Sequence, residues 1–119
     1  MSESRRPRVA LIFTGGTIDS VGTDRLDLAW YIEAGKRLNE GELVAAVPEL
    51  AGIADVEEIP FRRLPSQSIK DQDLFDLINL IHRLFDEDRA DGVVITHGTN
   101  TLEETALFLH LTVKRDKPV

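Results

Sequence analysis

The sequence predicts an α/β protein with an open, mainly parallel sheet, in a three-layer α/β/α arrangement. Three segments have the composition of strands, and segments with helix signals lie between them. This alternation is typical of a parallel sheet whose strands are joined by right-handed crossovers. The order β-loop-α-β-α-β-α fits one domain over residues 1–119 and stops as another strand begins. We therefore expect the sheet to be incomplete at its C-terminal end.

The first half of the chain is expected to supply two strands and a short helix. Val9-Ala10-Leu11-Ile12-Phe13 is continuously apolar, as in a buried strand. Asn39 is expected to cap a helix that Pro48 helps to end. The expected elements are a strand over 8–13, a mobile loop or a hairpin over 20–38, a helix over 40–47 and a weakly alternating strand over 53–61.

The second half is expected to supply two longer helices around a third strand. Ser68 with Asp71, and Thr101 with Glu104, have the spacing of capping boxes at helix starts. The first of these helices has an apolar stripe at 3.6-residue spacing, formed by Leu74, Leu77, Ile78, Ile81, Leu84 and Phe85. The expected elements are a loop over 64–68, a helix to about 85, a central strand over 93–95, a helix to about 113 and the start of a fourth strand at Val119.

Composition and charge exclude several classes of function. The net charge of −7 argues against non-specific binding to nucleic acid or to an anionic membrane. The chain has no cysteine, and its three histidines are scattered, so no metal-ligand spacing is present. The N-terminus lacks the apolar core of a secretory signal, and no apolar stretch approaches the roughly 20 residues of a membrane span. We expect a soluble cytoplasmic protein, although a mature form without its signal would look the same.

Hydroxyl side chains follow all three strands. Gly15-Gly16 ends the first strand and leaves Thr17 just beyond it. Thr96-His97-Gly98-Thr99-Asn100-Thr101 repeats this pattern after the third strand, and Ser66-Gln67 follows the second. Because ligands bind at the carboxyl ends of the strands in open α/β sheets, we expect these turns to meet at one site.

Each of these residues also has a purely structural interpretation. Thr17 is either a turn cap or a nucleophile that needs a nearby base and oxyanion donors. Thr99 is either an N-cap or a cleft residue, and the spacing of Thr101 fits the cap better. A Ser66–His97–Asp triad is a further alternative without a supporting motif. The glycines match neither of the common phosphate-binding motifs.

At these residues the sequence resembles the bacterial-type L-asparaginase (asparaginase/glutaminase) family. Thr14-Gly15-Gly16-Thr17-Ile18 is similar to its first signature, and the segment from Thr96 to Thr105 to its second. Ser66-Gln67 and Asp116-Lys117-Pro118-Val119 are similar to the segments that follow each signature. The resemblance implies a flavodoxin-like N-terminal domain that hydrolyses the side-chain amide of L-asparagine, and often of L-glutamine, without a cofactor or a metal.

The resemblance also implies roles for individual residues. Thr17 would be the nucleophile, and Thr99 would belong to a second catalytic group. Ser66 and Gln67 would hold the α-carboxylate and α-ammonium of the substrate. Tyr31 would be the catalytic tyrosine of a mobile lid. Gly16 and Gly98 would border the site and offer backbone N–H groups to the oxyanion.

The sequence departs from the family pattern in two ways. Asn100 stands where the family usually has aspartate, which would pair with the substrate ammonium. The catalytic lysine and the C-terminal domain of the family lie beyond Val119, so the chain is expected to be a truncated N-terminal domain. It would be a fragment, half of a complementing pair or an inactive product, and a homo-oligomer (dimer or tetramer) or a complementing chain is the expected partner.

Two other functions are open at this point. A non-catalytic amino-acid-binding or regulatory module would use the same residues without turnover. A flavodoxin-like domain that binds phosphate or a nucleotide is the other alternative, although the Gly-Gly turn lacks the lysine and the spacing of a phosphate cradle.

Overall fold

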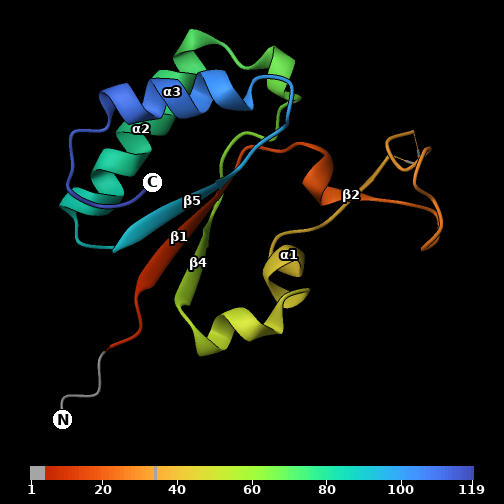
Figure 1. Cartoon of the computed structure of the whole chain (residues 1–119), viewed down its shortest axis with the longest axis horizontal. Coiled ribbons are helices and arrows are strands. Elements are labelled where there is room, and N and C mark those ends of the chain that lie inside the picture. The colour runs from red at the N-terminus through yellow and green to blue at the C-terminus, as the bar shows by residue number, and fades with distance from the viewer. Residues whose placement is uncertain (1–4, 34) are drawn as a thin grey trace.

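A computed structural model describes residues 5–33 and 35–119 of the chain. Its centre is a parallel sheet in the order β4-β1-β5, with helices packed against it (Figure 1). β1 spans Arg8–Phe13, β4 spans Asp55–Ile59 and β5 spans Gly92–Thr96. β1 is the central strand, pairing Ile12 with Ile59 on one side and with Ile95 on the other. The predicted α/β fold with a mainly parallel sheet is confirmed.

Two long helices cover one face of this sheet. α2 spans Asp71–Asp86 and α3 spans Leu102–Thr112, and they lie together on the same side of the sheet (Figure 1). Ile12 and Ile81 are fully buried where β1 meets α2. Burying each side chain of this size contributes roughly 1.5–3 kcal/mol. The predicted stripe of α2 supplies four buried residues, Leu77, Ile81, Leu84 and Phe85.

The other face of the sheet carries shorter elements. The helix α1, Glu42–Ala45, and the 3-10 turn η2, Pro48–Gly52, lie on the side of β4 away from α2 and α3 (Figure 1). Val94 of β5 points to this face beside Leu11 and is 51% exposed. This face is therefore covered less completely than the face that packs on α2 and α3.

The segment over 20–38 is a hairpin rather than an unpaired loop. β2, Ser20–Val21, pairs antiparallel with β3, Lys36–Arg37. The connection between them extends away from the sheet (Figure 1). Three of its apolar side chains, Leu26, Leu28 and Trp30, are more than 70% exposed.

Two predicted helix starts are wrong. The helix expected over 40–47 is reduced to α1, because Gly41 has a φ of 84° and interrupts it. Asn39 does not cap α1 through its oxygen; its side chain donates to Glu42 Oε2 at 3.1 Å. At the start of α2, Asp73 Oδ2 accepts from the Lys70 N–H at 2.9 Å, so Ser68 and Asp71 form no capping box.

Three predictions about the strands differ from the structure in part. The second strand is shorter than the predicted 53–61, and β5, predicted as a central strand, lies at one end of the three-stranded order. Beside it, the Val93 N–H donates to Pro118 O at 2.9 Å, so the backbone just before Val119 lies next to β5. Within the described residues, no strand is assigned at Val119.

None of the helices in the described part of the chain has the length and apolarity to cross a membrane.

An ion-pair cluster fixes the N-terminal ends of β1 and β5. Asp91, just before β5, accepts from Arg8 through its backbone N–H at 2.8 Å and through its guanidinium at 2.9 Å. Arg5 donates to the same carboxylate at 3.1 Å. The hydrogen bonds from Arg8 hold the pKa of Asp91 well below its ordinary value.

We predict that Asp91→Asn lowers the thermal unfolding midpoint at neutral pH. Because the folded-state pKa of Asp91 is depressed, its charge stabilises the fold above the unfolded pKa of about 3.9. That contribution is lost as pH falls through the lower folded-state pKa. The midpoint difference between wild type and variant, measured by circular dichroism, should shrink below about pH 4. Asp116→Asn is the control, because Asp116 has no ion pair within the described residues. A difference that stays constant with pH would contradict the prediction.

Candidate functional site

The turns after the three strands lie together because parallel strands end at the same edge of the sheet. Thr14, directly after β1, donates through its hydroxyl to Thr96 O of β5 at 2.6 Å. Its own carbonyl accepts from the Leu64 N–H, in the segment after β4, at 2.9 Å. The end of β1 is therefore bonded to both neighbouring turns.

Glycines allow these turns to touch through their backbones. Gly16 has a φ of 108°, and a Cβ built on it would lie 2.8 Å from the N and Cα atoms of Gly98. A Cβ on Gly98 would in turn lie 2.8 Å from Ser66 Oγ. Real Cβ atoms do not approach other atoms so closely, so neither turn has room for a side chain here. Gly98 therefore contacts both Gly16 and Ser66, and the three turns meet at one place.

Side chains also join the turns after β4 and β5. Asn100 Nδ2 donates to Gln67 Oε1 at 3.0 Å. Thr101 Oγ1 donates to Ser66 O at 3.0 Å. The predicted capping box of Thr101 with Glu104 is wrong, because the Thr101 hydroxyl bonds to the neighbouring turn and not to the first turn of α3.

A cavity of about 520 Å³ lies between these turns, large enough for a small molecule. It is lined by seven of the predicted site residues, Gly16, Thr17, Ser66, Gln67, Gly98, Thr99 and Asn100. Thr17 and Thr99 are exposed, and neither hydroxyl is hydrogen-bonded to a described residue. Two hydroxyls are therefore available to a ligand in this cavity.

Tyr31 is the predicted residue that does not line this cavity. It is half-buried in the connection between β2 and β3, where its neighbour Ile32 reaches the cavity instead. The role of Tyr31 stays a prediction.

A charged cluster at the cavity is not indicated by any motif in the sequence. Asp19 is only 2% exposed, and its carboxylate lies 2.9 Å from Arg37 Nη1 and 3.9 Å from Arg63 Nη1. All three residues line the cavity. The proximity of Asp19 to Thr17 in sequence was the available signal. Its partners come from β3 and from the segment after β4, and no sequence spacing indicates that pairing.

His97 is not part of a triad with Ser66. Its Nδ1 atom lies 2.6 Å from Gly98 O, to which it can donate. No hydrogen bond joins His97 to Ser66 in the described part of the chain. Among the described residues, no group of three or more His, Asp and Glu side chains is arranged to hold a metal ion.

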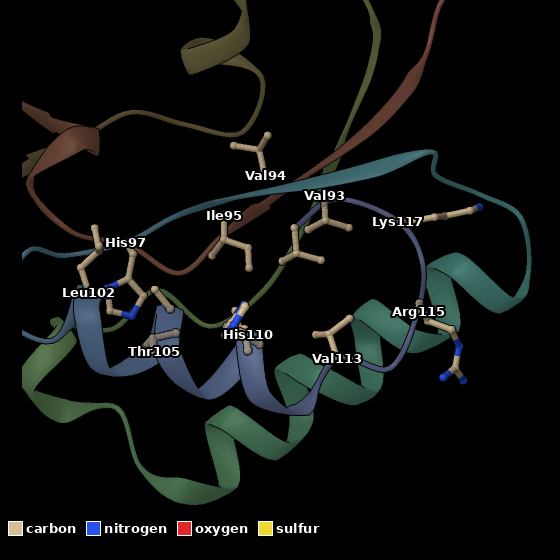
Figure 2. A pocket seen from close by; sticks show the side chains of 13 residues that line it. Val93, Val94, Ile95, His97, Leu102, Thr105, His110, Val113, Arg115 and Lys117 are labelled. Atoms are coloured by element: carbon tan, nitrogen blue, oxygen red, sulfur yellow. The ribbon is translucent and has the colours of Figure 1, made fainter.

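A second cavity, of about 500 Å³, lies between β5 and α3. Figure 2 shows His97 and Leu102 at one end and Lys117 and Arg115 toward the other. Most of its other lining residues are apolar: Val93, Val94, Ile95, Ala106, Leu109, Val113 and Val119. Apart from His97, whose triad with Ser66 is not formed, it contains none of the residues predicted for the site, so the cavity at the strand ends is the better candidate for chemistry.

Comparison with known proteins identifies the family. A protein-family model described as "Asparaginase, N-terminal" matches residues 8–119. This chain belongs to the asparaginase family. The resemblance of its two signature segments to asparaginases is thereby confirmed.

The asparaginase relatives are longer than this chain. It is 40% identical to a glutaminase-asparaginase of Pseudomonas fluorescens biotype A, covering 99% of this chain and 32% of that protein. It is 42% identical to L-asparaginase 2 of Bacillus subtilis, covering 95% and 30%. A crystal structure of a probable cytoplasmic L-asparaginase from Campylobacter jejuni matches with a TM-score of 0.84 and 38% identity, over 96% of this chain and 33% of that one. The chain thus spans about a third of the length of these asparaginases.

We predict that Gly16→Ala destabilises this asparaginase domain more than Gly41→Ala does. Both glycines have positive φ, so alanine strains the backbone at each by roughly 1–3 kcal/mol, and by more at Gly16, whose φ of 108° and ψ of −179° lie in a region that only glycine adopts readily. Only at Gly16 would the new methyl group also meet Gly98, at 2.8 Å, which adds roughly 1–3 kcal/mol of overpacking. At Gly41 nothing lies within 4 Å. Urea unfolding of both variants measures the difference, and equal losses would show that the contact of Gly16 with Gly98 is unimportant.

Proposed function

We propose that this chain is the N-terminal domain of an amidohydrolase that converts L-asparagine to L-aspartate and ammonia, with L-glutamine as a second substrate. The observation that supports this most directly is the cavity at the strand ends. Two hydroxyl side chains, Thr17 and Thr99, line it beside the contact between Gly16 and Gly98. The family supports the proposal, since its relatives include an L-asparaginase and a glutaminase-asparaginase by name.

Thr17 is proposed as the nucleophile. Its Oγ attacks the carbonyl carbon of the side-chain amide, giving a tetrahedral intermediate whose negative charge lies on the former carbonyl oxygen. The C–N bond then breaks, ammonia leaves with the proton from the hydroxyl, and an ester on Thr17 remains. Water hydrolyses this ester, which releases aspartate and restores the hydroxyl. Thr99, on the opposite turn, belongs to the group that activates the nucleophile or the water.

The remaining cavity residues have proposed roles in holding the substrate. Ser66 and Gln67 bind the α-carboxylate and α-ammonium, and Asn100, which is hydrogen-bonded to Gln67, lies beside them. Backbone N–H groups next to Gly16 and Gly98 serve the oxyanion, because no side chain stands between these glycines. No residue of this set requires a cofactor for its role.

The proposed active site also needs a residue from a polypeptide segment outside these 119 residues. Because the chain spans about a third of its relatives, we propose that a C-terminal segment, in the same or in a second chain, supplies a lysine that activates Thr99. An oligomeric assembly and a cytoplasmic location stay predictions. The alternative function is amino-acid binding without turnover, favoured by the fact that all proposed substrate-holding residues belong to this chain.

Ammonia release from L-asparagine tests the proposed nucleophile. The chain is joined to the C-terminal two thirds of the Bacillus subtilis relative, and Thr17→Val and Thr99→Val are compared with Thr17→Ser. We predict that each valine variant lowers kcat/KM by about a thousand-fold or more, since valine keeps the shape but removes the reacting hydroxyl. Thr17→Ser retains measurable activity. Valine variants with the wild-type rate would exclude these residues, and binding of asparagine without turnover by the wild type, measured by calorimetry, would favour the alternative function.

We predict that Asn100→Asp lowers KM for L-asparagine. A carboxylate would add a charge-assisted contact to the substrate ammonium, worth roughly 1–3 kcal/mol, or about five- to 150-fold in KM. The Gln67 amide must then turn over, so that its NH₂ group faces the new carboxylate. Asn79→Asp, on the exposed side of α2, is the matched control and should leave KM unchanged. A KM that rises in Asn100→Asp would show that the bond from Asn100 to Gln67 matters more than the added charge.

A further inference from the structure

One arginine holds the turn that carries Thr17. Arg37 Nη1, in β3, lies 3.0 Å from Gly16 O, 2.9 Å from Asp19 Oδ1 and 2.6 Å from Ser20 Oγ. These acceptors lie on both sides of Thr17 in the chain. Since the Thr17 hydroxyl itself has no hydrogen bond to a described residue, the position of Thr17 depends on the contacts of its neighbours.

The buried carboxylate of Asp19 keeps Arg37 in this place. A carboxylate that is 2% exposed is stable only with a charged partner, because burial removes its hydration. Arg37 supplies the closer partner at 2.9 Å, and Arg63 lies 3.9 Å from the other oxygen. Moving Arg37 away would leave most of this buried charge uncompensated.

The contact with Gly16 O fixes the peptide that leads into Thr17. That carbonyl belongs to the planar Gly16–Thr17 peptide, so its direction sets the position of the Thr17 N and Cα atoms. A hydrogen bond from a guanidinium is charge-assisted and stronger than one between neutral groups. Gly16 is also in backbone contact with Gly98. The turn is therefore held both by Arg37 and by the turn after β5.

We propose that Arg37 is a positioning residue for the Thr17 nucleophile and that buried Asp19 is its anchor. Neither side chain needs to touch the reacting atoms; the pair holds the Gly16–Ser20 turn so that the Thr17 hydroxyl faces the cavity. The inference rests on the proposed function, in which Thr17 attacks the amide. A reacting group that is misplaced by about 1 Å can cost about a hundred-fold in rate.

Steady-state kinetics test this role, with the chain joined to the C-terminal two thirds of the Bacillus subtilis relative as above. Arg37→Met is expected to lower kcat by about 30- to 100-fold with KM changed by less than about threefold, since the substrate-holding residues are untouched. Arg37→Lys keeps the charge beside Asp19 but replaces the planar guanidinium with a shorter side chain that ends in an ammonium group, so its loss should be smaller, about tenfold. Arg25→Met is the control, because Arg25 lies in the same hairpin without an ion pair to a described residue. It should retain wild-type kinetics.

A double variant separates positioning from a general structural role. In the Thr17→Val background, Arg37→Met should change the residual rate by less than about twofold, because there is no hydroxyl left to position. A structural role predicts the same further loss in both backgrounds. If Arg37→Met does not fold, Arg37→Lys and Asp19→Asn are each tested in the wild-type and Thr17→Val backgrounds instead. Each variant is then assayed at the same temperature difference from its own unfolding midpoint.

The outcomes also distinguish this inference from the proposed function. Wild-type activity in Thr17→Val would overturn the nucleophile assignment itself. Loss of activity in Thr17→Val with a wild-type kcat in Arg37→Met and Arg37→Lys would overturn only the positioning role. A rise in KM that matches the fall in kcat would also overturn it, because the arginine would then act on the substrate site as a whole.

Discussion

The backbone contact between the turns after β1 and β5 is the constraint on which the rest of the site depends. Gly16 has no room for a methyl group because it lies against Gly98, and Gly98 has none because it lies against Ser66. Parallel strands in the order β4-β1-β5 bring all three turns to one edge. The cavity lies at this contact, and Thr17 and Thr99, each directly after one of the two glycines, line it.

The sequence was informative where one physical rule dominates. The continuous apolarity of β1 and the stripe of α2 reflect burial, and both elements form, although α2 begins later than predicted. The strand-end rule placed Thr17, Ser66 and Thr99 at one cavity, because the topology of a parallel sheet leaves few alternatives.

The sequence was less informative where several partners compete for one polar group. Thr101 has the spacing of a capping box, yet its hydroxyl bonds to Ser66 O, which becomes adjacent only in the folded sheet. Asn39 and Ser68 were misassigned as caps because both helices begin later than predicted: Gly41 precedes α1, and Lys70, whose N–H donates to Asp73, precedes α2. The pair of Asp19 and Arg37 joins the turn after β1 to a hairpin strand, and no periodicity in the sequence reports it.

The parallel pairing of β4, β1 and β5 has a consequence for how the cavity comes into being. Its lining residues come from three parts of the chain that are distant in sequence. The long segments between these parts must therefore close before the lining residues meet. Closing such loops costs entropy before the contacts between turns can form. The cavity therefore forms only when β4, β1 and β5 are paired. A small molecule that occupies it stabilises only the fully paired sheet, which links occupancy of the cavity to folding of the entire domain.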